Sequence, residues 1–579
     1  MENHSENSTW HLVERSSLPK GSKDLRTKWV YDDKNGPDGQ IVRFKARLTA
    51  MGNIQREGID FHETFASVMR TKIFKCMLQL WNEHPDHNME HWDIKSAFIN
   101  AIMEEDIWIE QPDGHHGPGS EGMPCKLDRA LYVCRQSGRA WQKMLTSILA
   151  AAGFTRLVRD QAVYAALTDD GGWCYIPTHV DDLFMLFNNE GRALRNKVFD
   201  ELMKTVKVKN EGTVHWALKT LIERDPEKGI LKISQGQYAR EAVQRFGFAE
   251  AKGEPTHAYD TGPLSEMTLE DLPGSPAAIV AQHALHPYYE AVGCLWWLAS
   301  IFRPGIYTAV YQASRYVSKP SEKLWKWIVR IFRYLKQDPD RGLIYTRPVI
   351  AQTNGKFIPE GPLLNGSADS SFADADKKKS TLGQVYWFMG TLIDWKSKTS
   401  TRVLDLSTDA EYCSLVAFGK ENTWLRELLK ELGIFVVDKP TPVQEDKTAA
   451  IALSGQGPTK RSRHYDISFY RFKEQVELKE MVLEYVNTHN NPADFFTKPL
   501  GRAKFEYFRD LIMGSRTSSK RTKPWAPSLL TYGDAALRRT SRIPKSPTTL
   551  MPRHRGVQIH YPCMDSQGLD LCMPEQQRS

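Results

Sequence analysis

Two adjacent aspartates, Asp181 and Asp182, interrupt the otherwise apolar stretch CYIPTHVDDLFMLFN of residues 174–188. The apolar runs on both sides predict two strands, so the two acids are expected at the tip of a hairpin. A third acid, Asp93, lies in the predicted strand NMEHWDI of residues 88–94. Carboxylates that meet at strand ends can hold two divalent cations about 3.5–4 Å apart, an arrangement that serves phosphoryl transfer. A plain turn, in which Asp bonds its own backbone, explains the adjacent pair without any metal.

Magnesium is the expected ion, because it is a hard cation that prefers a few carboxylates together with phosphate oxygens. Successive side chains on a strand point to opposite faces, so Asp181 and Asp182 are expected to differ, with one the closer ligand. By the same rule His179 is expected on the face of Asp181.

Acidic residues at the ends of predicted elements recur near the end of the chain. The set comprises Asp369, Glu411, Asp446 and Asp494. These four acids also suit a two-metal site. Simpler explanations exist for three of them. Thr408 and Glu411 have the spacing of a helix capping box, and Asp446 and Asp494 have positions that a helix N-terminus favours.

The composition is that of a globular protein of several domains, with 579 residues, 41% of them hydrophobic and 25% charged. Its eight cysteines have no regular spacing, which argues against a disulfide framework or a structural zinc site. The net charge of +7 comes from residues 515–579, which hold 11 basic and 4 acidic side chains. The rest of the chain is neutral, so its charge gives no evidence of nucleic-acid binding.

Periodicity predicts strands and helices over most of the chain, including an amphipathic helix over residues 71–83 and a helical region over 287–336. Residues 250–286 and 348–362 are rich in Gly, Pro and Ala and are expected to be linkers. The longest apolar run has twelve residues, 291–302. A bilayer requires about 20, so no membrane partner is expected.

Several blocks of sequence resemble the Ty1/copia-type retrotransposon reverse transcriptase with its ribonuclease H domain, a fragment of the Pol polyprotein. They follow one another in the family's order from about residue 10 to residue 514. The blocks include KARLTAMGNIQREGIDFHETFASVMR, HWDIKSAFINAIMEEDIWIEQPDG, ALYVCRQSGRAW, HVDD, YYEAVGCLWWLASIFRPGI, RIFRYLKQDPDRGLIY, WKSKTSTRVLDLSTDAEY, EDKTAAIAL, HYDISFYRFKEQVE and NPADFFTKPL.

The resemblance implies an α/β (α+β) protein: a right-hand polymerase of fingers, palm and thumb, followed by a ribonuclease H-like domain with a mixed five-stranded sheet. Five segments are expected: a polar, loop-like N-terminal extension (1–28), fingers and palm (29–250), thumb and connection (251–358), the ribonuclease H-like domain (359–514), and a basic tail without stable structure (515–579).

The resemblance also assigns roles to residues. Asp93, Asp181 and Asp182 would bind the metals of the polymerase, with two Mg²⁺ or Mn²⁺ ions in each active site. Asp369, Glu411, Asp446 and Asp494 would be the ribonuclease H acids and metal ligands. Asp409 competes with Glu411 for this role, and Glu411 is preferred because Ala-Glu-Tyr on a helix fits the wider ribonuclease H pattern.

Four further residues are expected to bind the nucleotide. Phe98 would be the bulky gate against a ribose 2′-hydroxyl, although its residue type alone favours a core aromatic on a helix. Lys45 and Arg47 would hold the triphosphate, although they also suit a solvated strand face. Gln136 would lie near the nucleotide.

The implied partners are an RNA template, a DNA primer, an RNA/DNA hybrid and dNTPs, with capsid and integrase proteins of the element as further candidates. The implied location is cytoplasmic, within virus-like particles, with the nucleus as a second site.

Five positions depart from the family pattern: His179, Val133 (followed by Cys134), Lys219, Ser371 and Gly305. Two of them replace a glycine, and a lost glycine can leave a strained backbone. The alternative is therefore a catalytically impaired or domesticated remnant that only binds nucleic acid.

Overall fold

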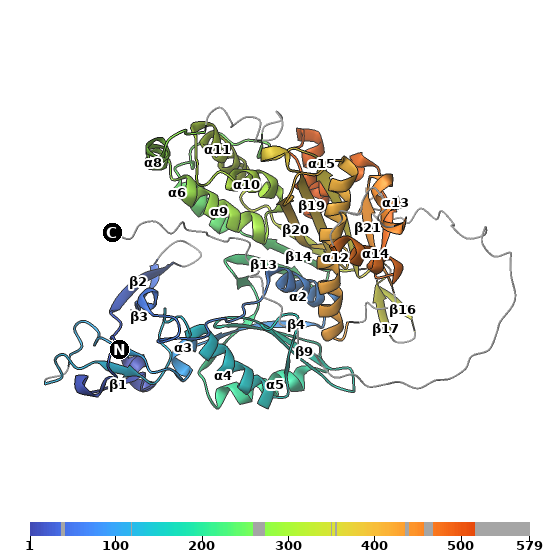
Figure 1. The fold of residues 1–579 in the computed structure, drawn as a ribbon. Coiled ribbons are helices and arrows are strands. Elements are labelled where there is room, and N and C mark those ends of the chain that lie inside the picture. Colours follow the sequence, from blue (N-terminus) through green and yellow to red (C-terminus); the bar gives the residue numbers. More distant parts are fainter. Residues whose placement is uncertain are drawn as a thin grey trace, which may run out of the picture. The chain divides into compact units, whose positions relative to one another are not determined.

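The computed structural model describes residues 1–35, 41–116, 119–258, 264, 272–348, 350–353, 356–359, 361–434, 439–456 and 467–515 (Figure 1). The chain forms two compact units, residues 1–522 and 523–579, and all the described residues lie in the first. Apart from Ser515, the predicted basic tail lies outside the described residues. None of the described helices has the length and apolar character needed to cross a bilayer.

A six-stranded antiparallel sheet carries the first group of acids. Its order is β11 (Val208–Thr213), β4 (Asn88–Ile94), β10 (Asp182–Phe187), β9 (Trp173–His179), β8 (Val163–Leu167) and β7 (Thr155–Arg156). The predicted hairpin over residues 174–188 is therefore confirmed. Alternation puts Leu183 and Phe184 on opposite faces of β10, and both side chains are fully buried, so the sheet is covered on both sides.

Helices α4 (Ser137–Ala151) and α5 (Arg192–Met203) cover the face of Leu183, and α2 (Thr71–Glu83) covers the face of Phe184 (Figure 1). The rings of Phe74 in α2 and Phe184 are 5.0 Å apart. This second face belongs to a large core that continues into the rest of the chain.

The N-terminal part forms two small sheets and short helices. One sheet has the order β1 (Trp10–Leu12), β6 (Cys125–Leu127), β5 (Trp108–Ile109), and the other is the hairpin of β2 (Thr27–Asn35) and β3 (Ile41–Ala50). The remaining elements are α1 (Glu2–Glu6), η1 (Arg15–Ser17), η2 (Gly52–Ile54) and α3 (Ala97–Asn100).

The prediction of a loop-like extension over residues 1–28 is wrong. Strand β1 pairs with β6, Trp10 packs against the buried core, and the His4 ring lies 5.0 Å from the Trp10 ring. The polar composition of residues 1–28 did not predict this structure, because the segment is anchored by only two aromatic contacts.

The middle of the chain joins segments that are far apart in sequence. Strands β12 (Trp216–Ala217), β13 (Thr220–Asp225), β14 (Ile230–Ser234) and β15 (Leu343–Thr346) form one sheet. Helices α6 (Gly236–Arg245), α8 (Pro276–Leu285), α9 (Tyr288–Ile301), α10 (Tyr307–Ser314) and α11 (Glu322–Gln337), with η3 (Pro304–Ile306), complete this part. Because β14 pairs with β15 and α6 packs on α11, the structure has no boundary at residue 250.

The C-terminal part is an α/β layer. Its five-stranded sheet has the order β20 (Thr391–Thr399), β19 (Thr381–Phe388), β18 (Leu364–Ser371), β21 (Thr441–Glu445), β22 (Met481–Tyr485). The first three strands are antiparallel, and β21 and β22 are parallel to β18, so the sheet is mixed and five-stranded as expected.

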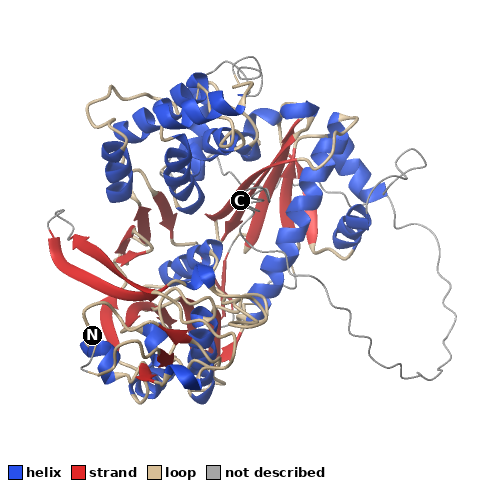
Figure 2. Cartoon of the chain, turned by 60° about the vertical axis from the view of Figure 1, so that its left-hand side comes forward, coloured by secondary structure: helices blue, strands red, loops and turns tan. Residues whose placement is uncertain are grey.

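Helices lie beside this sheet (Figure 2). They are η4 (Asp376–Lys378), α12 (Ser407–Glu431), α13 (Thr448–Gln456), α14 (Ile467–Glu477), η6 (Thr488–Asn490), η7 (Pro492–Phe496) and α15 (Arg502–Ile512). A separate hairpin joins β16 (Ile350–Thr353) to β17 (Lys356–Pro359). Gly366 lets α12 approach closely, because a Cβ there would lie 2.1 Å from the Phe418 ring.

Helix α2 joins the six-stranded sheet to the five-stranded C-terminal sheet through its polar side. Lys72, Lys75, Gln79 and Asn82 recur at helical spacing, as in an amphipathic helix, yet the last three are buried and Lys72 is mostly buried. The Gln79 and Asn82 amides donate to the carbonyls of Thr346 and Gly229, at 3.2 and 3.1 Å. The polar stripe therefore faces protein where a helix of this pattern usually faces solvent.

Lys72 makes the strongest contact of this stripe. Its Nζ lies 2.7 Å from Asp394 of β20 and 2.6 Å from Glu421 of α12. Burial alone would lower the pKa of Lys72, but the charges of Asp394 and Glu421 outweigh it and raise the pKa to about 12. Lys75, without such a pair, stands 3.6 Å from the centre of the Trp395 ring, and burial lowers its pKa to about 7.

We predict that Lys72→Ala lowers the free energy of unfolding by about 3 kcal/mol, because it leaves two mostly buried carboxylates without their cation. Chemical denaturation at pH 7 measures this change. Lys23→Ala, at an exposed lysine outside this cluster, is the control and should change the value by less than about 0.5 kcal/mol. Equal effects of the two substitutions would contradict the structural role of Lys72.

Candidate active sites

The hairpin of β9 and β10 places its acids against β4. Asp182 lies directly opposite both Asp93 and His179 in the strand register. The turn needs a left-handed residue, and Val180 supplies it with φ +59°. Such a conformation in a β-branched residue costs about 1–3 kcal/mol, so the surroundings must hold it.

Two hydrogen bonds hold this turn. The Trp141 indole donates to the Val180 carbonyl at 2.7 Å, and the Ile94 amide donates to the Asp181 carbonyl at 2.9 Å. Because Val180 is left-handed, strand alternation does not continue through the turn. The rule that placed His179 with Asp181 therefore does not apply here, and the register partner of His179 is Asp182.

Asp181 and Asp182 have different surroundings. Asp181 lies at the exposed tip, where partial desolvation, followed by the charges of Asp182 and Asp93, raises its pKa, while Lys45 opposes the shift. Asp182 lies beside His91, whose Nε2 is 2.7 Å from Oδ1 of the carboxylate. Sequence reasoning missed His91 as a partner. Its position two residues before Asp93 on the same strand was the available signal.

The three acids of this sheet are neighbours, but they do not form a closed cluster. Among the described residues, Asp93, Asp181 and Asp182 do not form a group whose ligand atoms all lie within 4.8 Å of one another. One oxygen of the Asp182 carboxylate lies 2.7 Å from His91 Nε2.

Cationic and aromatic residues surround these acids. Lys45 and Arg47 lie two residues apart on β3. The charge of Lys45 acts on Asp181, and the charge of Arg47 acts on Tyr132. Arg47 Nη1 also lies 3.5 Å from Asp32. Phe98, on α3, meets the Tyr132 ring edge to face, with the ring centres 5.3 Å apart. Tyr132 was missed by sequence reasoning, and only its position next to Val133 in a recognised block pointed to it.

Gln136 lies apart from this group. It is 1% exposed, its Oε1 accepts from Gln55 Nε2 at 3.1 Å, and its own Nε2 donates to the Asp60 carbonyl at 3.1 Å. Both ends of the amide are therefore used inside the protein. Its role at the nucleotide stays a prediction, and the contacts shown connect α4 to the loop of residues 55–60.

The replaced glycines do occupy left-handed positions. Val133 has φ +72° and Lys219 has φ +57°, so both side chains sit in backbone conformations that favour glycine. Gly305 does not have a left-handed φ, and a Cβ there would meet its nearest neighbour at 3.6 Å. The backbone and Cβ of an Asp would therefore fit at this position. Ser371 is the last residue of β18 and pairs with Thr381.

The C-terminal acids form a tight cluster. Asp369 on β18, Glu411 on α12 and Asp446 after β21 each offer an oxygen, and these oxygens all lie within 4.8 Å of one another. Parallel pairing of β21 with β18 brings the ends of these strands together, and α12 crosses beside them. Asp409 is not a member of this group.

The capping-box explanation of Glu411 is wrong. Helix α12 begins at Ser407, with Leu406 as its N-cap, so Thr408 lies inside the helix and makes no cap bond. Glu411 is 8% exposed and points at other acids. A capping role therefore does not account for this residue.

Crowding of negative charge dominates the electrostatics of the cluster. Burial, followed by the charges of Glu445 and Asp446, raises the pKa of Glu411 to about 9. Burial, followed by Glu411 and Asp494, also raises the pKa of Asp369 well above its usual range. Glu445, fully buried at the end of β21, was missed by sequence reasoning, and its pKa is raised by burial as well.

Asp494 differs from the other three predicted acids. Its carboxylate contacts two lysines, Lys498 at 2.6 Å and Lys504. Burial would raise the pKa of Asp494, but these lysines outweigh it and the pKa is lowered. Thr497, on the same segment, donates to Asp369 at 2.6 Å and links the two acids.

The cluster fits a divalent cation. It offers hard oxygen donors, and one oxygen each of Glu411 and Glu445 is buried without a hydrogen-bond partner among the described residues. The raised pKa values reflect negative charge that no neighbouring lysine offsets at Glu411. A bound cation would offset that charge.

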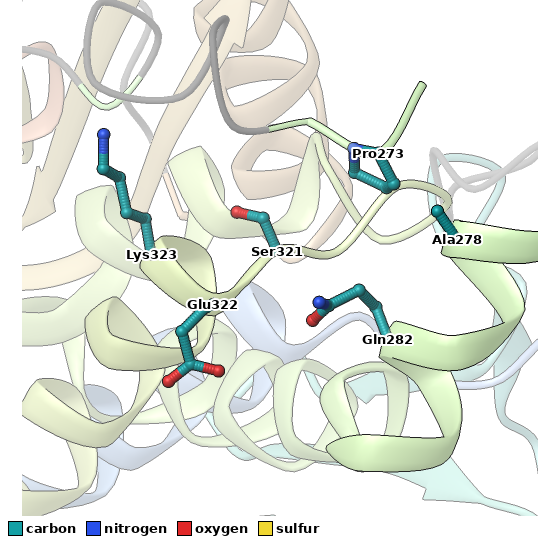
Figure 3. A pocket seen from close by; sticks show the side chains of 6 residues that line it. All are labelled: Pro273, Ala278, Gln282, Ser321, Glu322 and Lys323. Atoms are coloured by element: carbon teal, nitrogen blue, oxygen red, sulfur yellow. The ribbon is translucent and has the colours of Figure 1, made fainter. Parts of the chain in front are cut away.

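Two pockets of the described structure, of about 310 and 500 Å³, lie elsewhere. The smaller one, between α8 and α11, is shown in Figure 3 and is lined by Pro273, Ala278, Gln282, Ser321, Glu322 and Lys323. Neither pocket is lined by any of the acids described above.

Most of this chain is similar to known proteins. Residues 7–258 match the family described as reverse transcriptase (RNA-dependent DNA polymerase). The chain is 32% identical over 518 residues to the retrovirus-related Pol polyprotein from transposon TNT 1-94 of Nicotiana tabacum, covering 88% of this chain and 37% of that protein. It is 28% identical over 505 residues to the Pol polyprotein from transposon RE2 of Arabidopsis thaliana, covering 87% and 32%.

Residues 7–258 belong to the reverse transcriptase family, and the chain is similar over most of its length to retrotransposon Pol polyproteins. It spans about a third of the length of these two relatives. A transposon Ty5-1 protein of Saccharomyces cerevisiae is 27% identical over 322 residues, which cover 55% of this chain and 96% of that protein. A solved foamy viral protease–reverse transcriptase bound to double-stranded DNA is 10% identical with a TM-score of 0.19, too low to compare the folds.

We predict that Glu411→Gln makes the stability of this protein less sensitive to pH. In a chelator the folded protein keeps Glu411 protonated up to about pH 9, whereas the unfolded chain releases that proton near pH 4.5. The unfolded state is thus favoured as pH rises through this window, and stability falls. The variant should lose less stability between pH 5 and pH 9, by at least about 1.4 kcal/mol, the equivalent of one pKa unit.

Denaturation in EDTA at pH 5, 7 and 9 measures this difference. Added Mg²⁺ should stabilise the wild-type protein more at pH 8 than at pH 6 and should stabilise the variant less. Glu474→Gln, at an exposed position of α14, is the matched control. Parallel pH profiles for wild type and Glu411→Gln would contradict a raised pKa.

Proposed function

We propose that this chain is an RNA-directed DNA polymerase of a Ty1/copia-type element that extends a primer with dNTPs. The observation that carries the proposal is the strand register that sets Asp182 opposite Asp93, with Asp181 at the adjacent tip, where the charge of Lys45 of β3 acts on it. Three acids with a cationic side chain beside them suit a triphosphate that reacts at its α-phosphate.

Each residue has a role in this proposal. Lys45 and Arg47 hold the triphosphate oxygens, with Arg47 able to bind two at once. Asp93, Asp181 and Asp182 would hold two Mg²⁺ or Mn²⁺ ions, which when bound stabilise the charge on the attacking and leaving oxygens. The primer 3′-hydroxyl attacks the α-phosphate in line, and pyrophosphate leaves. Phe98 blocks the space that a 2′-hydroxyl would need.

We further propose that the C-terminal cluster cleaves the RNA strand of an RNA/DNA hybrid. Asp369, Glu411 and Asp446 would hold the metal ions, and the 4.8 Å grouping of their oxygens supports this. Asp494 positions Asp369 through Thr497 and is itself held by Lys498 and Lys504. In this proposal the fingers and palm begin at residue 29, and the segment that ends at residue 358 grips the hybrid. Residues 359–514 cut the RNA strand of that hybrid.

The template RNA, the primer and the hybrid are the proposed partners. Contacts to phosphate and sugar position such substrates without reading their sequence, as expected of an enzyme that copies any template. Capsid and integrase proteins of the element are further candidate partners, since the relatives are longer Pol polyproteins.

We predict that Asp181→Asn abolishes primer extension. Removing one carboxylate from the group leaves the metal ions without a ligand, and the rate on poly(rA)/oligo(dT) with Mg²⁺ or Mn²⁺ should fall at least about a hundredfold. Asp169→Asn, in an exposed loop, is the control and should retain wild-type activity. Folded wild-type protein that extends no primer would instead support the binding-only remnant, which the strained Val133 and Lys219 favour.

We predict that Asp446→Asn abolishes hybrid cleavage but leaves primer extension within about twofold, because the two acid groups lie in different sheets. The same preparation is assayed on a labelled RNA/DNA hybrid and on a primed template. The converse pattern is expected of Asp181→Asn. Loss of both activities from either substitution, in folded protein, would show that the two sites do not work separately.

A further inference from the structure

Tyr132 lies at a junction of the N-terminal elements. Its carbonyl accepts a hydrogen bond from the Ala50 amide at 3.1 Å, and it pairs with Thr49 as an isolated parallel bridge at the end of β3. Its side chain is only partly buried. The backbone of this residue is therefore fixed to the strand that carries Lys45 and Arg47.

The Tyr132 ring contacts the proposed gate directly. It meets Phe98 with ring centres 5.3 Å apart and planes at 69°, an edge-to-face arrangement that is a favoured geometry for aromatic pairs. Phe98 lies on a helix of only four residues, α3, and is itself partly exposed. So short a helix fixes the backbone of Phe98 but leaves its ring dependent on neighbours.

The hydroxyl end of Tyr132 is held as well. It bonds to the side chain of Ser96, which precedes α3 and has a left-handed backbone with φ +58°. The Ser96 hydroxyl also accepts a hydrogen bond from the Asn3 amide of α1 at 2.5 Å. Ser96 lies between Asp93 and Phe98 in the chain, so these contacts hold the segment that joins an acid to the gate.

We propose that Tyr132 is a positioning residue that fixes the Phe98 ring and thereby sets how strictly the polymerase site excludes nucleotides with a 2′-hydroxyl. The inference rests on the proposed polymerase function and adds a residue that determines its sugar specificity. A hydroxyl group is small, so a ring that shifts by about 1 Å leaves room for it. Tyr132 acts on the substrate only through Phe98.

The test compares incorporation of a dNTP and of the matching rNTP by the full chain. The ratio of their kcat/KM values should fall about three- to tenfold in Tyr132→Ala, the range expected for loss of one edge-to-face contact. The change should come from a lower KM for the rNTP, with kcat for the dNTP within about twofold. Tyr132→Phe keeps the ring and should retain at least half of the wild-type ratio.

Tyr470→Ala, which removes an exposed tyrosine of α14, is the matched control and should leave the ratio unchanged. Thermal unfolding monitors folding, and Tyr132→Leu replaces Tyr132→Ala if the latter does not fold, with the same expected fall. Primer extension with dNTPs by the wild-type protein is measured first.

Three outcomes would overturn the inference. An unchanged ratio in Tyr132→Ala or Tyr132→Leu, with normal dNTP incorporation, would overturn it alone. An equal fall in Tyr132→Phe and Tyr132→Ala would show that the ring contact is not the cause. No dNTP incorporation by wild-type protein would overturn the proposed function and this inference together.

Discussion

The contact of Lys72 with Asp394 and Glu421 is the interaction on which the arrangement of the described chain depends. It ties α2, which covers the first sheet, to both a strand and the long helix of the C-terminal layer. A single cation between two carboxylates is stable out of water only if all three groups are present. The apolar core continues from α2 into both layers, and the hydrogen bonds of Gln79 and Asn82 add to the contact of Lys72.

Charge also explains why the two acid groups differ. In the first sheet, His91 engages Asp182 and the hairpin tip exposes Asp181, so negative charge is spread out. In the second, Asp369, Glu411 and Asp446 lie together, and burial with neighbouring negative charge raises the pKa of Glu411 and of Asp369. Lys498 and Lys504 contact Asp494, and the charge of Lys498 also acts on Asp369. The acids of the first sheet therefore form an open group, and those of the C-terminal sheet form a closed one.

Much of the fold and site could be predicted from local pattern. Alternation located β9 and β10, with Asp181 and Asp182 at their junction, and the mixed five-stranded sheet was expected. Asp369 was expected after its strand but lies inside β18, and Asp494 was expected to open the final helix but lies in η7. The positive φ at Val133 and Lys219 followed from replaced glycines. Local pattern did not predict strand pairing with a distant segment. Strand β1 pairs with β6, and β14 pairs with β15, which lies more than a hundred residues later in the chain.

The sequence by itself determined which residues could do chemistry and which elements carry them, because residue type and periodicity are local properties. Only the tertiary structure decided which carboxylates meet, and it added His91, Tyr132 and Glu445, whose roles depend on neighbours from other elements. It also buried the polar stripe of α2. Periodicity shows that one side of a helix is polar, but solvent and a second layer of protein can both satisfy that side.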